Sequence, residues 1–134
     1  MLKKALSKFR FSILASLLLL AACSAASPVN SAASAVESYL QSLVARDLNG
    51  AVNASCAAWE EQARLEYNSF EAVKLELQDV QCKETGQDSP YTLVACTGTI
   101  VANYGNEDLQ IDVADRSYQV IQEGGEWKMC GYHP

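Results

Sequence analysis

The stretch Ser34-Ala35-Val36-Glu37-Ser38-Tyr39-Leu40-Gln41-Ser42-Leu43-Val44 decides the fold, because it carries the first regular pattern of a folded segment. Its apolar residues recur at intervals of three and four and so share one stripe of a helix: Val36, Tyr39, Leu40, Leu43 and Val44. Ser34 and Glu37 fit a capping box, in which each side chain satisfies a free backbone amide of the first turn. We therefore expect an amphipathic helix that starts at Ser34 and packs against a second layer.

Two shorter helices are predicted after this one. Asp47 is an N-cap candidate for a helix that continues to Cys56, because aspartate readily accepts a hydrogen bond from the first free amides. Trp59, Ala63 and Tyr67 then keep a spacing of four, which predicts a third helix within residues 57–68. The first half of the chain is therefore expected to be helical.

The second half alternates with a period of two and predicts strands. The expected strands cover residues 73–82, 94–104, 109–120 and 126–132. The alternation slips near Gln78-Asp79 and again near Asp115, as a β-bulge would produce, and residues 83–90 have the composition of a loop. Gly124-Gly125 supplies the last hairpin turn. The predicted fold class is α+β, with N-terminal helices packed on a bent four-stranded antiparallel sheet.

The N-terminus has the pattern of an export signal. Residues 1–10 carry four positive charges, and residues 11–22 are apolar apart from two serines. This run is shorter than the ~20 residues that a membrane-spanning helix needs. Leu20-Ala21-Ala22-Cys23 resembles the lipobox of bacterial lipoproteins, which implies cleavage before Cys23 and lipidation of that cysteine. The alternative is ordinary cleavage after Ala26, which would release a soluble protein.

These patterns divide the chain into a signal peptide (1–22), a lipid anchor and linker (23–31) and one domain (32–134). The expected location is the non-cytoplasmic side of a bacterial membrane, and Ser24 is compatible with the outer membrane where two membranes are present. After removal of the signal, six basic and 16 acidic residues leave a net charge of −10. Such a charge disfavours nucleic acid as a partner and an electrostatic hold on anionic lipids.

Five cysteines leave one unpaired in an exported protein, and lipidation of Cys23 accounts for it. The remaining four suggest two disulfides with three possible connectivities. Pairing of strands in sequence order places Cys82 opposite Cys96, which leaves Cys56 for Cys130. No C-x-x-C pair is present and the acidic residues 107–115 do not follow a calcium-loop spacing, so no metal or cofactor is expected.

Helices followed by a bent antiparallel sheet resemble the cone-shaped fold of nuclear transport factor 2-like (NTF2-like) proteins, in particular small lipoproteins with lumazine-binding-like or unknown-function domains. The resemblance rests on the segments 36–53 and 118–121 and on Glu126-Trp127-Lys128, with Cys56 just beyond the first segment. A cystatin-like fold is the nearest competitor. The resemblance implies a pocket between the helices and the concave face of the sheet.

Enzymes of the NTF2-like superfamily place an aspartate with a tyrosine or histidine in this pocket. The corresponding candidates here are Asp47, Asp112, Asp115, Tyr39, Tyr67 and Tyr118. No nucleophile, metal cluster or phosphate loop accompanies them, so a catalytic role is not expected. A ligand pocket would instead be lined by large aromatic residues, which are also common in plain cores: Tyr39, Trp59, Tyr67, Tyr118 and Trp127.

The sequence thus favours a non-catalytic envelope lipoprotein that binds a small apolar ligand or an envelope protein. The alternatives are a small isomerase or cyclase of the same superfamily and a secreted soluble domain.

Overall fold

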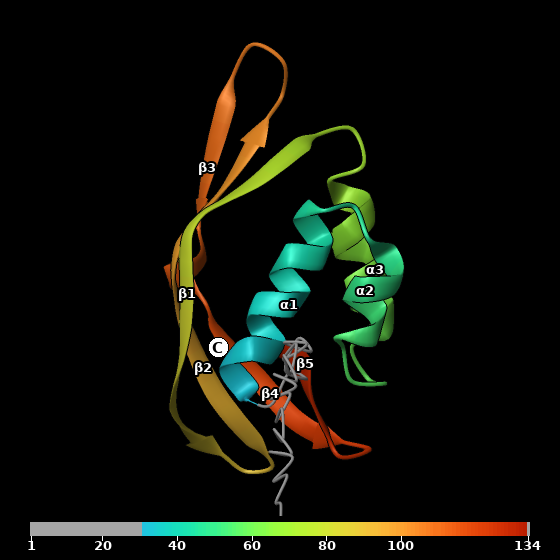
Figure 1. The fold of residues 1–134 in the computed structure, drawn as a ribbon, viewed down its shortest axis with the longest axis vertical. Coiled ribbons are helices and arrows are strands. Elements are labelled where there is room, and N and C mark those ends of the chain that lie inside the picture. Colours follow the sequence, from blue (N-terminus) through green and yellow to red (C-terminus); the bar gives the residue numbers. More distant parts are fainter. Residues whose placement is uncertain (1–30, 134) are drawn as a thin grey trace, which may run out of the picture.

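A computed structural model describes residues 31–133, which form three helices and a five-stranded antiparallel sheet (Figure 1). The helices are α1 (Ala32–Val44), α2 (Leu48–Asn53) and α3 (Glu60–Ser69). The strands are β1 (Lys74–Asp88), β2 (Tyr91–Asn103), β3 (Asp108–Asp112), β4 (Ser117–Glu123) and β5 (Glu126–His133), and a 3-10 turn, η1 (Val113–Asp115), precedes β4. The predicted α+β class is confirmed. The signal peptide and Cys23 lie outside the described residues.

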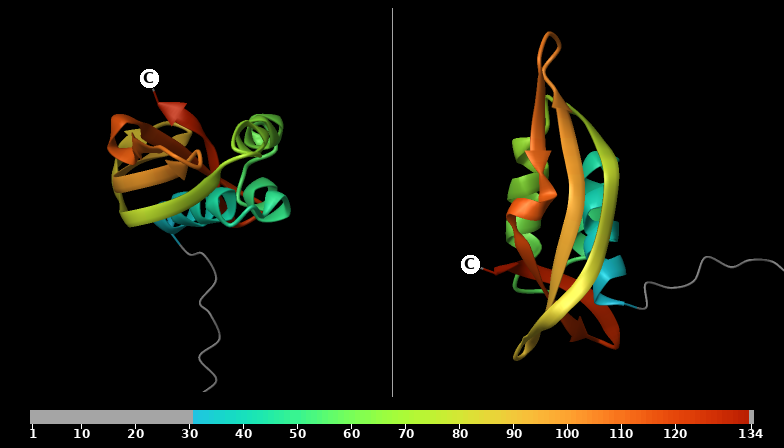
Figure 2. Two further views of the ribbon diagram at one scale, coloured as in Figure 1. Left: turned by 90° about the horizontal axis from the view of Figure 1, so that it is seen from above. Right: turned by 90° about the vertical axis from the view of Figure 1, so that its left-hand side faces the viewer.

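Strand β2 is the centre of the sheet. It pairs with β1 along one edge, and along the other edge it pairs with β3 through residues 99–103 and with β4 through residues 92–95. Strand β5 extends the sheet by pairing with β4. The sheet curves around α1, while α2 and α3 lie beside α1 away from β1 and β2 (Figures 1 and 2). The core therefore lies between α1 and the concave face of the sheet.

The apolar stripe of the first helix occupies this core as predicted. Four of its residues are at most 4% exposed: Val36, Tyr39, Leu40 and Leu43. Alternate residues of β2 supply the facing layer: Thr92, Val94, Cys96, Ile100 and Ala102 are also buried. Burial of each large aliphatic side chain stabilises the fold by ~1.5–3 kcal/mol, so the stripe on α1 is a major part of the stability.

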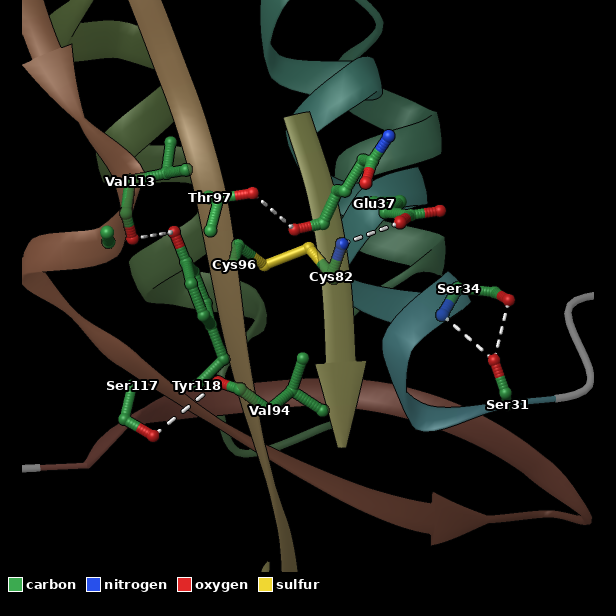
Figure 3. Close-up of a disulfide and its surroundings, with 12 residues drawn as sticks. Ser31, Ser34, Glu37, Cys82, Val94, Cys96, Thr97, Val113, Ser117 and Tyr118 are labelled. Atoms are coloured by element: carbon green, nitrogen blue, oxygen red, sulfur yellow. Dashed lines mark hydrogen bonds between the residues drawn. A yellow bond between two sulfur atoms is a disulfide. The ribbon is translucent and has the colours of Figure 1, made fainter. Parts of the chain in front are cut away.

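The predicted start of this helix was wrong by three residues. Ser31, not Ser34, is the N-cap, because Ser31 has an extended backbone and its hydroxyl accepts a hydrogen bond from the Ser34 amide at 3.1 Å. Glu37 is then too far along the helix to cap it. Its carboxylate instead accepts a hydrogen bond from the Cys82 amide of β1 at 2.9 Å, which fastens α1 to the sheet (Figure 3).

The other two helices end or begin within a few residues of their predicted limits. Asp47 caps α2 as predicted, with its carboxylate accepting a hydrogen bond from the Gly50 amide at 2.8 Å. The helix stops at Asn53 rather than Cys56, because residues 54–56 leave it to pair with β5. Helix α3 follows with Trp59 at its N-cap position.

The sequence predicted four strands, whereas the structure has five. The expected long strand 109–120 is divided into β3 and β4 by η1, because the Asp112 carboxylate accepts a hydrogen bond from the Ala114 amide at 2.8 Å and closes a turn. This turn stands where a bulge near Asp115 was predicted. It buries Val113 in the core, and both strands continue along the same edge of β2.

The predicted loop at residues 83–90 was also wrong. Strand β1 continues through it to Asp88, which pairs with Tyr91, so only Ser89-Pro90 remains as the turn. The hydrogen bonds that this segment makes to β2 keep it in the sheet despite its loop-like composition. The pairing contains one register shift, between Glu84 and Gly86.

Residues 31–133 contain two disulfides, Cys82–Cys96 and Cys56–Cys130, which are the pairs that the strand order favours. Cys82 and Cys96 are direct partners in the β1–β2 register (Figure 3). The second bridge joins the segment after α2 to β5, where the Cys56 amide also donates a hydrogen bond to the Met129 carbonyl at 2.8 Å. The first bridge thus links β1 to β2, and the second attaches the helical segment to β5.

Within residues 31–133, no helix is long and apolar enough to cross a membrane.

The bulge predicted near Gln78-Asp79 is confirmed, and Gly98 makes it possible. Two residues of β1, Asp79 and Val80, stand opposite the single residue Gly98 of β2. Gly98 has a φ of +104°, and a Cβ atom there would lie 2.6 Å from the Gln78 carbonyl oxygen. Only glycine fits this position, because both the backbone conformation and the close approach exclude a side chain.

We predict that Gly98→Ala lowers the free energy of unfolding by about 2 kcal/mol or more, from backbone strain and the clash with β1. Gly86→Ala is the matched control, since nothing lies within 4 Å of the position that its methyl group would take and its φ is not positive. We expect the control to stay within about 0.5 kcal/mol of the wild type in urea unfolding. Equal stability of the two variants would contradict this account of the bulge.

Candidate functional site

A pocket of about 290 Å³ opens between the helices and the concave face of the sheet. Its apolar wall comes from α1, β2, β3 and the segment from η1 to β4: Leu40, Leu43, Ile100, Ile111, Val113 and Tyr118. Its other lining residues are mostly polar and come largely from α3 and its C-cap: Gln62, Glu66, Ser69, Phe70, Asp112, Arg116 and Tyr132. The pocket therefore offers an apolar surface together with a few charged groups, which is the usual composition of a small-molecule site.

Glu66 is a charged residue of the pocket whose carboxylate is held in place by hydrogen bonds. Its Oε2 atom accepts a hydrogen bond from the Tyr39 hydroxyl at 2.7 Å and another from the Tyr132 hydroxyl at 2.9 Å. These three residues come from α3, α1 and β5 respectively. The carboxylate is thus held in a fixed position by two donors from separate elements, and hydrogen bonds to a charged acceptor are stronger than neutral ones.

A bulge in β5 brings Tyr132 into this site. Gln119 pairs with Gly131 and Val120 pairs with Met129, so Cys130 is the extra residue. Without the bulge, Met129 and Tyr132 would point to opposite faces of the sheet, since they are three positions apart. With it, both face the concave side, and Tyr132 pairs with the buried Tyr118.

The phenols of the site are strongly biased toward their protonated forms. Burial is the largest cause of the raised pKa values of Tyr39 and Tyr132, and the adjacent Glu66 charge raises both further. Burial also raises the pKa of Tyr118 to about 12, while the Arg116 charge opposes that rise. At neutral pH, Tyr39 and Tyr132 therefore act as hydrogen-bond donors to the carboxylate and not as bases.

Aromatic rings surround Tyr132. Trp59 meets it edge to face and Tyr118 lies tilted beside it, each with ring centroids 5.5 Å apart. The Arg116 guanidinium lies over the ring at 4.8 Å from the centroid, in a cation–π contact. The Trp59 indole nitrogen is buried and has no hydrogen-bond partner of normal geometry among the described residues, although its proximity weakly opposes the pKa rise of Tyr39.

The five aromatic residues proposed as pocket lining do not all reach it. Tyr118 lines the pocket, and its hydroxyl points toward the Val113 carbonyl at 3.5 Å (Figure 3). Tyr39 lies behind the wall as the partner of Glu66, and Trp59 lies against Tyr132.

The remaining two aromatic residues lie elsewhere. Tyr67 donates a hydrogen bond to the Arg46 carbonyl at 3.3 Å and lies under that arginine's guanidinium. Trp127 pairs with Gln122 near the β4–β5 turn and packs on the core from there.

The three candidate catalytic aspartates are all exposed. Asp47 and Asp112 are engaged as caps of α2 and η1, and Asp115 lies within η1. Asp112 alone among them lines the pocket. The described residues also contain no cluster of three or more histidine, cysteine or acidic side chains able to hold a metal ion.

The sequence prediction missed Glu66, Arg116 and Tyr132. Glu66 was detectable in principle, because it lies three residues after the buried Ala63 and so falls on the inner stripe of α3. Tyr132 was not, because its orientation depends on the bulge at Cys130. Arg116 follows the unpredicted turn η1, which sets its direction.

Neither a protein-family model nor a curated protein matches this sequence. Among solved structures, the chain is similar to the crystal structure of the helical cell shape determining protein Pgp2 from Campylobacter jejuni, with a TM-score of 0.50 and 12% identity. The similarity covers 75% of this chain and 38% of that protein's chain, so this chain corresponds to less than half of its length. At this identity the likeness shows a shared fold.

Proposed function

We propose that this protein is a cell-envelope lipoprotein, tethered through Cys23, whose NTF2-like domain binds a small, largely apolar molecule without catalysing its conversion. The observation that carries the binding proposal is the pocket between α1, α3 and the concave sheet, with Glu66 fixed in it by Tyr39 and Tyr132. A rigid charged group beside an apolar wall orients a ligand, because the polar contact fixes one end while the wall buries the other.

The size of the pocket restricts the ligand. Its volume of about 290 Å³ equals that of roughly ten water molecules. This lies at the lower end of ordinary ligand pockets, which begin at ~300 Å³. We therefore assign a small ligand to the site, with a short apolar segment against Leu40, Leu43 and Ile100.

The NTF2-like assignment is supported by the order of the elements and by the curvature of the sheet. Three helices precede the sheet, and the long strands β1 and β2 bend around α1 (Figure 2). The bulge at Asp79 lies in the β1–β2 pair and contributes to that bend, since bulges raise the local twist of a strand, while η1 and the bulge at Cys130 redirect the strands on the other side of the sheet. The shared fold with part of a cell shape determining protein supports a common architecture and transfers no role.

The envelope location rests on the signal-like residues 1–22, on the lipobox-like Leu20-Ala21-Ala22-Cys23 and on the disulfides. Two disulfides are typical of proteins exported to an oxidising compartment. With a charge of −10 after signal removal, the domain has no electrostatic attraction to anionic lipid, so the membrane link would be the lipid on Cys23. Where the host has two membranes, we assign the protein to the outer one, with which Ser24 is compatible.

An envelope protein as the partner is the second candidate, and one observation favours it. Tyr104 and Leu109, at the two sides of the β2–β3 turn, are 57% and 49% exposed. Their hairpin projects beyond the helices (Figure 1), where a partner could reach it.

The isomerase or cyclase alternative has less support, because its candidate aspartates are exposed and the phenols around Glu66 hold their protons.

The ligand proposal predicts that filling the pocket mouth abolishes binding of a small neutral probe. Gln62 is exposed and lines the pocket one turn before Glu66, so Gln62→Trp should occupy the site without disturbing the core. We expect 1-hexanol to shift the methyl NMR signals of Leu40, Leu43 and Ile111 in the full processed chain, and the variant to weaken binding by at least about tenfold.

Leu65→Trp is the matched control, because Leu65 lies on the same helix, is 53% exposed and does not line the pocket. It should bind 1-hexanol like the wild type. Absence of saturable hexanol binding to the wild type, or equal weakening by both tryptophans, would overturn the pocket as a ligand site.

The proposed lipid anchor on Cys23 predicts that Cys23→Ala moves the protein from the membrane fraction to the soluble fraction of its host. Ser24→Ala should leave the protein in the membrane fraction. The intact mass of the wild type should include acyl chains on Cys23. A membrane-bound Cys23→Ala protein, or a wild-type mass without acyl groups, would contradict the proposal.

A further inference from the structure

Glu66 lines the pocket without a cationic partner. Neither carboxylate oxygen has a lysine, arginine or histidine nitrogen within 4 Å among the described residues, whose ion pairs involve other groups. Both phenol hydrogen bonds fall on Oε2, which leaves Oε1 free of protein hydrogen bonds within residues 31–133. A half-buried carboxylate of this kind favours a positively charged ligand, because desolvation of an unpaired charge is costly.

The charged lining of the pocket has a net charge of −1. Glu66 and Asp112 are its two acids and Arg116 its one base. Asp112 accepts a hydrogen bond from the Ala114 amide, and the Arg116 guanidinium lies on the Tyr132 ring. The domain as a whole, with six basic and 16 acidic residues, also carries a negative charge and hence a negative field. Such a field raises the local concentration of cations and repels anions.

The aromatic part of the lining suits the same kind of ligand. Phe70, Tyr118 and Tyr132 contribute to the pocket that contains Glu66. The Arg116 guanidinium already lies over the Tyr132 ring at 4.8 Å from its centroid, so Phe70 and Tyr118 are the rings of the lining that a ligand would use. Aromatic rings beside a carboxylate stabilise organic ammonium groups through the negative face of the ring.

We propose that the pocket recognises a small organic cation that carries a short apolar tail, an alkylammonium in its simplest form, with the Glu66 carboxylate as its counter-ion. The inference rests on the proposed ligand-binding function and specifies the head group. The tail lies against Leu40, Leu43 and Ile100, and the ammonium group donates to Oε1 of Glu66. Tyr39 and Tyr132 are positioning residues, because they hold the carboxylate and leave its second oxygen for the ligand.

The test compares three probes of equal length on the full processed chain in uncharged detergent micelles. Hexylammonium should bind at least about tenfold more tightly than 1-hexanol, as expected for a hydrogen bond to a charged group, and hexanoate should bind more weakly than 1-hexanol. Calorimetric titration gives all three affinities. If 1-hexanol binds and hexylammonium binds no better, the head-group inference is overturned while the ligand pocket stands. If none binds, the proposed function itself fails.

Two variants test whether Glu66 is the residue that causes the preference for hexylammonium. Glu66→Gln keeps a side-chain oxygen that can accept from the two phenols, and it should lose the preference for hexylammonium over 1-hexanol. Its backbone NMR spectrum shows independently whether the variant is folded. Glu61→Gln is the matched control, because Glu61 is an exposed residue of the same helix that does not line the pocket, and it should keep the preference. A preference that survives Glu66→Gln, or disappears equally in both variants, would contradict the assignment to Glu66.

The ammonium group has two possible sources, a free amine or the amino head group of a lipid. Dihexanoyl phosphatidylethanolamine distinguishes them in a competition with hexylammonium. Competition in the wild type assigns a lipid head group, and its absence assigns a free amine; in both cases the recognised group is the ammonium.

Discussion

The hydrogen bonds from Tyr39 and Tyr132 to one oxygen of Glu66 are the interaction on which the site depends. They join α1, α3 and β5, three elements that are far apart in the sequence. The bonds connect both helices to the sheet beside the pocket that Glu66 and Tyr132 line. Because burial and the Glu66 charge raise the pKa of both phenols, each has a proton to donate at any physiological pH.

The position of these three residues depends in turn on irregularities of the sheet. The bulge at Asp79 opposite Gly98 bends β1 and β2 around α1, and the turn η1 redirects the chain into β4. The bulge at Cys130 then turns Tyr132 to the concave face, and the disulfide from this same residue to Cys56 fastens the strand to the helical segment. A regular sheet would be flatter and would aim Tyr132 away from Glu66.

The sequence predicted the features that follow from local patterns and from the order of the strands, and it missed the exact strand boundaries. The apolar stripe of α1, the Asp47 cap and the bulge near Asp79 are local patterns, and each is present. The extension of β1 through residues 83–88 and the division into β3 and β4 depend on hydrogen bonds to β2, which composition does not encode. Ser34 was favoured as the cap because a glutamate follows at the right spacing, but Ser31 precedes an equally good helical segment. The site was missed because the pairing of Glu66 with Tyr132 arises only when tertiary packing and the bulge at Cys130 bring the two side chains together.

The most direct test of this account is a double-mutant cycle between Glu66 and Tyr132. Glu66→Leu removes the acceptor with similar side-chain bulk, and Tyr132→Phe removes only the donor. Urea unfolding of the two single variants and the double variant measures the coupling free energy between them. We predict a coupling of about 1–3 kcal/mol, the range for hydrogen bonds to a charged group. Effects that add within about 0.5 kcal/mol would show that the two side chains do not stabilise each other, and would contradict the central role of this interaction.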